Sequence, residues 1–184
     1  LLDDEGYDAV FIGSGAGLPR FMGIPGENLN GVVSANEFLT RANLMHAYDQ
    51  AYDTPIYVGR RVVVVGGGNT AMDAARLAKR SGAESVTLVY RRTRKYMPAD
   101  EHELALALAD GVTFAELAAP VKQADGMLKC EKMVLGEADA SGRRSPVGSG
   151  EFFHIPCDLV ISAVGEQVDD ALMAANGIEL DKKG

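Results

Sequence analysis

The chain has 184 residues, with 18 Lys and Arg against 26 Asp and Glu, and therefore a net charge of −8. Its hydrophobic share of 47% and charged share of 24% are typical of a globular protein and exclude a wholly disordered chain. This length predicts one domain, or at most two small ones. The acidic excess argues against general nucleic-acid binding, which needs a surplus of Lys and Arg.

No stretch of about 18 uncharged apolar residues predicts a membrane span, and the acidic start lacks the cationic region of a secretory signal. The two cysteines, Cys130 and Cys157, are too few for a disulfide framework, a four-cysteine metal site or an iron–sulfur cluster. The three histidines lie far apart, without the spacing of paired metal ligands. We therefore expect a cytoplasmic domain without a metal and without membrane or nucleic-acid contacts.

Glycines are enriched, at 21 of 184 residues against the usual share of about 7%, and they cluster after apolar runs. Short, continuous apolar and β-branched runs predict strands that are buried on both faces, as in a parallel sheet. The expected strands are, in chain order, 9–12, 62–65, 86–90, 112–117 and 159–164.

Helical patterns separate these strands. Ala71, Ala74, Ala75 and Ala78 form a stripe of small residues that lets a helix lie close to a sheet, and Gly82 is a plausible stop signal. Further helical character lies at 35–48 and 99–109. The alternation of strand and helix predicts an α/β fold: a Rossmann-like parallel sheet with flanking helices.

Residues 121–134 alternate weakly around Asp125-Gly126, a hairpin turn signal, and predict a small antiparallel β excursion. The Ser-, Gly-, Arg- and Pro-rich stretch 139–150 predicts an exposed loop.

The strongest functional signal is a G-x-G-x-x-A motif that directly follows the four-valine strand and opens the alanine helix. It comprises Gly66, Gly67, Gly68, Asn69, Thr70 and Ala71. Gly66 permits a tight turn, Gly68 lets a pyrophosphate approach the backbone, and Ala71 keeps the helix close to the strand. The amides of residues 69–71 are expected to face the anion at the positive end of the helix. The alternative is a glycine turn without a ligand.

The end of the next strand predicts which nucleotide binds. NAD sites carry an acidic residue there for the ribose 2′-hydroxyl, but here the strand is followed by Arg91, Arg92, Thr93, Arg94 and Lys95. A guanidinium matches a 2′-phosphate, so we predict NADP(H), bound by Arg91 and Arg92 with Arg94 in reserve. The alternatives are a solvated basic turn or a patch for nucleic acid or an acidic partner.

Gly165 and Glu166 follow the last expected strand. The carboxyl ends of strands in such sheets face ligands, so this turn is placed to lie near the nicotinamide half of a dinucleotide. A plain strand-to-helix turn is an equal alternative. Nothing in the sequence suggests a catalytic acid, base or nucleophile.

Together these motifs resemble the NADPH-binding part of the small (β) subunit of glutamate synthase and related flavin oxidoreductases. The likeness is carried by residues 7–25, 62–76, 86–98 and 158–166. It implies an NADPH domain inserted in an FAD domain of similar design, as in two-dinucleotide-binding flavoproteins of the pyridine nucleotide-disulfide oxidoreductase superfamily. Hydride would pass from NADPH to FAD, and electrons onward to iron–sulfur clusters and a partner such as a large synthase subunit.

The resemblance also implies that the segments that hold FAD lie on both sides of this chain. The chain alone would then bind NADPH but would not catalyse hydride transfer. The expected parts are a flavin-domain edge and connecting segment (1–57), the NADPH-binding domain (58–166) and the start of the return to the flavin domain (167–184). Two rival interpretations stay open. One is a non-catalytic nucleotide-binding or docking module. The other, a thioredoxin-reductase-like enzyme, would need a C-x-x-C that is absent here.

Overall fold

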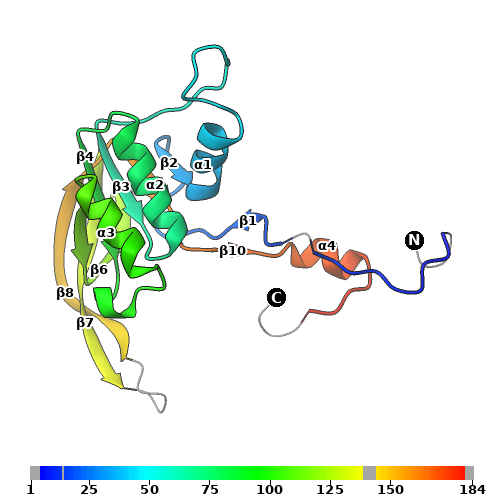
Figure 1. Ribbon diagram of the computed structural model, residues 1–184. Coiled ribbons are helices and arrows are strands. Elements are labelled where there is room, and N and C mark those ends of the chain that lie inside the picture. The colour runs from blue at the N-terminus through cyan, green and yellow to red at the C-terminus, as the bar shows by residue number, and fades with distance from the viewer. Residues whose placement is uncertain (1–4, 14, 139–143, 181–184) are drawn as a thin grey trace. The chain divides into compact units, whose positions relative to one another are not determined.

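The computed structural model describes residues 5–13, 15–138 and 144–180 (Figure 1). It divides into two compact units, residues 21–164 and residues 1–20 with 165–184. The larger unit contains, in chain order, β2 (Val32–Ser34), α1 (Ala35–Asn43), β3 (Arg61–Val65), α2 (Asn69–Arg80), β4 (Ser85–Tyr90), the 3-10 turn η1 (Arg94–Tyr96), α3 (Glu101–Ala109), β5 (Thr113–Glu116), β6 (Ala118–Ala124), β7 (Met127–Ala138), β8 (Arg144–Pro156) and β9 (Leu159–Ser162).

A parallel sheet forms the centre of the larger unit, with the strand order β2-β9-β3-β4-β5. β3 lies between β4, which follows it along the chain, and β9, which comes last. The expected parallel α/β sheet is therefore confirmed, with strands at four of the five expected places, whereas residues 9–12 form no strand. The short strand β2 was not expected; it pairs in parallel with β9 at the edge of the sheet.

Both faces of this sheet are covered, so its strands carry apolar residues on both sides. Val62 and Val64 point to the face covered by helices, where they pack with the alanines of α2. Val63 and Val65 point to the opposite face, where Leu128 of β7 belongs to the same buried cluster. Figure 1 shows α2 and α3 on one side of the sheet and β6, β7 and β8 on the other.

The helix α2 fits the sheet because its inner face is made of small residues. Ala71, Ala74, Ala75 and Ala78 are all fully buried, which confirms the expected stripe. The helix ends at Arg80, and Gly82 adopts a φ of +103° just beyond it. α3 begins at Glu101, two residues later than expected, because the side chain of Asp100 caps the helix by accepting a hydrogen bond from the amide of His102 (2.8 Å).

The antiparallel excursion is confirmed and is larger than expected. β6, β7 and β8 form a three-stranded sheet, and Asp125 and Gly126 connect the first two strands with φ angles of +52° and +69°, as a tight hairpin turn requires. The expectation of an exposed loop at 139–150 is wrong for residues 144–150, which belong to β8; residues 139–143 lie outside the described part. Pairing with β7, for example Val134 opposite Val147, outweighs the loop-like composition.

The smaller unit contains β1 (Leu18–Pro19), β10 (Glu166–Gln167) and α4 (Asp170–Ala175). β1 and β10 pair antiparallel, and the Arg20 amide donates to the Gly165 carbonyl oxygen (2.9 Å). The domain limits expected at residues 57 and 166 stay a prediction.

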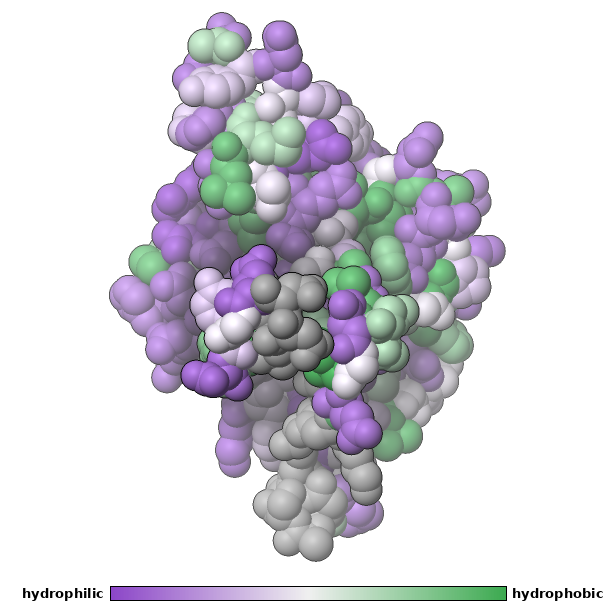
Figure 2. All heavy atoms as spheres, turned by 90° about the vertical axis from the view of Figure 1, so that its right-hand side faces the viewer, coloured by the Kyte–Doolittle hydropathy of each residue, from purple (hydrophilic) through white to green (hydrophobic). Residues whose placement is uncertain are grey.

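The surface carries several large apolar side chains, among them Phe11, Phe21, Leu44 and Tyr48. Figure 2 shows hydrophobic residues lying among hydrophilic ones on the face that it presents. Within the described residues, no helix combines the length and apolar character that crossing a bilayer requires.

Candidate functional site

The glycine motif lies at the carboxyl end of β3, where the chain turns into α2. Gly66 has a φ of +154°, and a Cβ at this position would lie 2.4 Å from the carbonyl oxygen of Ala163, just beyond β9. A Cβ on Gly67 would lie 2.4 Å from the ring of Tyr90, the last residue of β4. The neighbouring strands therefore require the first two glycines for the fold.

Gly68 differs from its two neighbours because the space beside it is open. A Cβ built there meets nothing within 4 Å, and its φ of −95° suits any residue. Gly68 is also the N-cap of α2, and it has no side chain to accept hydrogen bonds from the first turn. The third glycine is therefore the one that leaves room for a ligand at the positive end of the helix.

Of the three amides expected to face an anion, one has a partner within the chain. The Ala71 amide donates to the Gly68 carbonyl oxygen (3.0 Å), so Ala71 contributes to the turn and to the buried helix face. Among the hydrogen bonds of the described residues, none has the amide of Asn69 or Thr70 as its donor. These two amides remain available at the open end of α2.

The side chain of Asn69 has a structural role that sequence reasoning missed. Its Oδ1 accepts a hydrogen bond from the amide of Asp100 (2.9 Å), and the neighbouring Ala99 amide donates to the carbonyl oxygen of Gly67 (3.0 Å). The segment before α3 is thereby fastened to the glycine turn. Partners 31 residues apart leave no signal in a single sequence.

The basic turn follows β4, next to β3 in the sheet. Arg91 is exposed, whereas Arg92 is half-buried and its Nε is fully buried without a hydrogen-bond partner among the described residues. Arg94, the reserve candidate, donates to Glu101 (3.2 Å). Of these arginines, Arg92 therefore has a buried donor for which the described chain supplies no acceptor.

Two polar groups near the carboxyl ends of the strands were not anticipated. Glu116, the last residue of β5, accepts a hydrogen bond from the Arg94 amide through Oε2 (2.9 Å), and so helps to shape the basic turn. Ser162, the last residue of β9, is 7% exposed, and its Oγ has no partner among the described residues. A single hydroxyl at the end of an apolar strand is the only sequence signal that could have identified Ser162.

Gly165 and Glu166 belong to the smaller unit, with Glu166 in β10. Their expected place beside the nicotinamide stays a prediction. Among the residues that the structure describes, no three His, Cys, Asp or Glu side chains are grouped to hold a metal ion. Cys130 and Cys157 are both buried thiols in the core between the two sheets.

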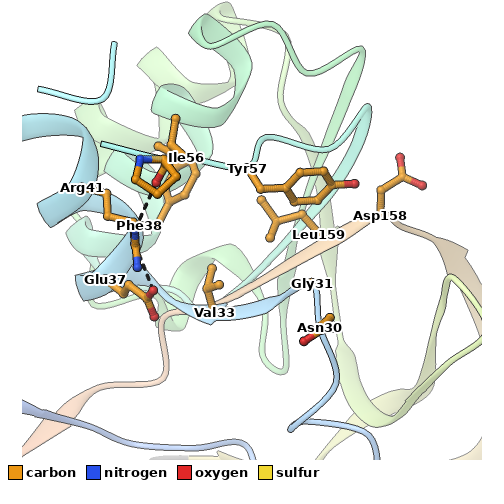
Figure 3. Close-up of a pocket in the computed structure, with 11 residues that line it drawn as sticks. Asn30, Gly31, Val33, Glu37, Phe38, Arg41, Ile56, Tyr57, Asp158 and Leu159 are labelled. Carbon is orange, nitrogen blue, oxygen red and sulfur yellow. Dashed lines mark hydrogen bonds and ion pairs between the residues drawn. The ribbon is translucent and has the colours of Figure 1, made fainter. Parts of the chain in front are cut away.

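A pocket of about 520 Å³ lies at the opposite edge of the sheet, near the amino ends of β2 and β9 (Figure 3). Its wall combines apolar side chains such as Phe38 with charged ones that already have partners. Arg41 donates to Glu37 (3.0 Å) and to the Pro55 carbonyl oxygen (3.1 Å). Asp158 accepts from Arg61. This pocket therefore offers a ligand less free hydrogen-bonding capacity than the glycine turn.

The model of the pyridine nucleotide-disulphide oxidoreductase family matches residues 3–184. The chain is 41% identical over 188 residues to the NADPH-Fe(3+) oxidoreductase subunit beta of Geobacter sulfurreducens, covering 96% of this chain and 27% of that protein. It is 43% identical over 190 residues to the glutamate synthase [NADPH] small chain of Halomonas elongata, covering 98% and 40%. The chain thus spans less than half the length of these curated relatives.

Among solved structures, FprA from Mycobacterium tuberculosis in complex with NADPH has the same fold. The TM-score is 0.67 at 23% sequence identity, over 83% of this chain and 49% of FprA. The extent of the family match and the identity to the curated relatives lead to one conclusion. The chain belongs to the pyridine nucleotide-disulphide oxidoreductase family.

Proposed function

We propose that this chain is the NADPH-binding domain of a flavin-dependent oxidoreductase similar to the small subunit of glutamate synthase. The observation that carries the proposal is a pair of neighbouring features at one edge of the parallel sheet. Gly68 leaves open space at the amino end of α2, and Arg91 and Arg92 directly follow the adjacent strand β4. Dinucleotides bind at this edge in doubly wound sheets.

The residues present fit a phosphorylated dinucleotide. The free amides of Asn69 and Thr70 would receive the pyrophosphate at the positive end of α2. The half-buried guanidinium of Arg92 would donate to a 2′-phosphate, with Arg91 as the second cation. NADPH supplies a hydride when bound, and the chain's part is to bind and orient it, without a catalytic acid or base of its own.

The activity of the whole protein follows from the relatives as a further part of the proposal. Hydride would pass from NADPH to FAD held by a flavin domain of the same parent chain. Electrons would continue to an iron–sulfur group or a partner subunit. Support comes from the relatives' names, which include an NADPH-Fe(3+) oxidoreductase subunit beta and a glutamate synthase small chain. Gly165 and Glu166 would lie near the nicotinamide in this arrangement.

The proposal is tested by calorimetric titration of the 184-residue chain with NADPH and with NADH. We expect tighter binding of NADPH, and a loss of this preference when Arg91 and Arg92 are both changed to Ala. Charge-assisted hydrogen bonds to a phosphate make this loss about 10- to 100-fold in NADPH affinity, with little change for NADH.

A matched control is Arg60→Ala with Arg80→Ala, which removes the same charge from two exposed sites outside the basic turn. This variant should keep the preference for NADPH. Equal affinity of the wild-type chain for both nucleotides, or an unchanged preference in the Arg91/Arg92 variant, would contradict the assignment.

A further inference from the structure

The turn that carries the two arginines is closed by a side chain from the end of β4. The hydroxyl of Tyr90 donates a hydrogen bond to the carbonyl oxygen of Tyr96 (2.7 Å), so that residues 91–95 form a loop between two joined ends. Within the loop, the amide of Tyr96 also donates to the carbonyl oxygen of Thr93 (2.9 Å). Arg91 and Arg92 therefore lie on a segment held at both ends.

The same tyrosine also fixes this loop against the glycine turn. Its ring lies so close to Gly67 that a Cβ there would come within 2.4 Å of Cε2. Past the loop, Ala99 and Asp100 donate to the Gly67 carbonyl and the Asn69 side chain. The ring and these two hydrogen bonds set the distance between the open end of α2 and the basic turn.

We propose that Tyr90 is a positioning residue for recognition of the 2′-phosphate, acting through Arg91 and Arg92. The inference rests on the proposed function, because it concerns the same nucleotide site. The hydroxyl of Tyr90 holds the arginine loop closed. The ring of Tyr90 lies against Gly67 and so fixes the position of this loop relative to the glycine turn, which is proposed to bind the pyrophosphate. NADPH carries a 2′-phosphate as well as a pyrophosphate, so it must bind the basic turn and the glycine turn at the same time. NADH has only the pyrophosphate and needs only the glycine turn.

The burial of Arg92 makes this positioning matter. Its Nε has no hydrogen-bond acceptor among the described residues, so no hydrogen bond from this atom orders the side chain. The closed loop instead fixes the backbone that carries the arginine. When a binding group is ordered before the ligand arrives, less conformational entropy is lost on binding. The resulting gain in affinity applies only to a ligand that contacts this group, here NADPH through its 2′-phosphate.

The test is Tyr90→Phe, which removes the hydroxyl and keeps the ring against Gly67. We expect the NADPH affinity of the 184-residue chain to fall about fivefold, the usual effect of one neutral hydrogen bond, with NADH affinity unchanged. In the background of Arg91→Ala with Arg92→Ala, the same substitution should have no further effect on NADPH binding. Tyr57→Phe, at an exposed tyrosine near the opposite edge of the sheet, should leave both affinities unchanged.

The positioning role would be wrong, with the nucleotide site unaffected, if Tyr90→Phe left the ratio of NADPH to NADH affinity unchanged or lowered both affinities equally. It would also be wrong if Tyr90→Phe lowered NADPH affinity by the full amount in the background of Arg91→Ala with Arg92→Ala. A wild-type chain that does not prefer NADPH would instead refute the proposed function, and the positioning role with it. The ratio of NADPH to NADH affinity in the wild-type chain therefore distinguishes a failure of the positioning role from a failure of the proposed function.

Discussion

Replacing Gly68 with alanine separates the requirements of the fold from those of a ligand. The three consecutive glycines differ in what surrounds them. A Cβ on Gly66 or Gly67 would meet an atom at 2.4 Å, whereas a Cβ on Gly68 would meet nothing within 4 Å. The alanine methyl group in the Gly68→Ala variant therefore projects into the space that we assign to the pyrophosphate, and into no part of the described chain.

The expected effect of this substitution on stability is close to zero. The φ of −95° and ψ of 174° at Gly68 are ordinary for alanine, so no backbone strain arises. Alanine is a poorer N-cap than glycine, at a cost of about 0.5–1 kcal/mol. The smaller entropy of the unfolded chain offsets this by about 0.4–1 kcal/mol. The two effects leave a free energy of unfolding within about 0.5 kcal/mol of the wild type.

The effect on binding should be much larger. The methyl group keeps a pyrophosphate away from the amides of Asn69 and Thr70, and we expect at least a tenfold loss of affinity, about 1.4 kcal/mol, for NADPH and NADH alike. Loss for both nucleotides distinguishes this site from the basic turn, where only NADPH should be affected.

Gly66→Ala is the matched comparison. Its positive φ and the close approach of the Ala163 carbonyl should destabilise the fold by about 2–4 kcal/mol. Chemical denaturation gives the stability of both variants, and calorimetry gives the affinity. If Gly68→Ala binds both nucleotides like the wild type, the pyrophosphate does not lie on this turn. If it unfolds as easily as Gly66→Ala, the space beside Gly68 is not open.

Two further predictions concern titration and reactivity. The hydrogen bond from Arg76 to Asp110 holds the pKa of this carboxyl below its usual value. Since the folded chain then binds the proton less readily than the unfolded chain, the pair stabilises the fold at neutral pH and loses this effect as the pH falls below about 4. Arg76→Ala should therefore lower the melting temperature at pH 7 by more than at pH 3; equal shifts at both would contradict this. Burial raises the pKa of Cys130 to about 12 and also raises that of Cys157, so a thiol reagent at pH 7 should label neither until denaturant is added; rapid labelling of the native chain would disprove it.

The elements that could be predicted are those whose signal is local. Four adjacent valines, followed by glycines and an alanine stripe, specify β3 and α2 because each residue's place depends on near neighbours. The Asp125-Gly126 turn is equally local, since both residues must adopt positive φ angles. Elements that depend on distant partners could not be predicted. β8 is a strand at 144–150 because β7 lies beside it, and Pro146 is tolerated on a strand at the sheet edge.

The same division applies to the candidate site, and it bears on how specificity is built. The glycines and arginines are visible in the sequence because their chemistry is carried by residue type. The hydrogen bonds that join them are not visible in the sequence. The Tyr90 hydroxyl donates to the carbonyl oxygen of Tyr96, and the Asn69 side chain accepts from the amide of Asp100, 31 residues away. A basic pair after a strand is only a solvated turn until other groups hold it at a fixed distance from the phosphate-binding turn. In this chain those groups belong to the glycine motif and to the end of β4. The elements proposed to bind the pyrophosphate and the 2′-phosphate therefore also set the spacing between these two binding sites.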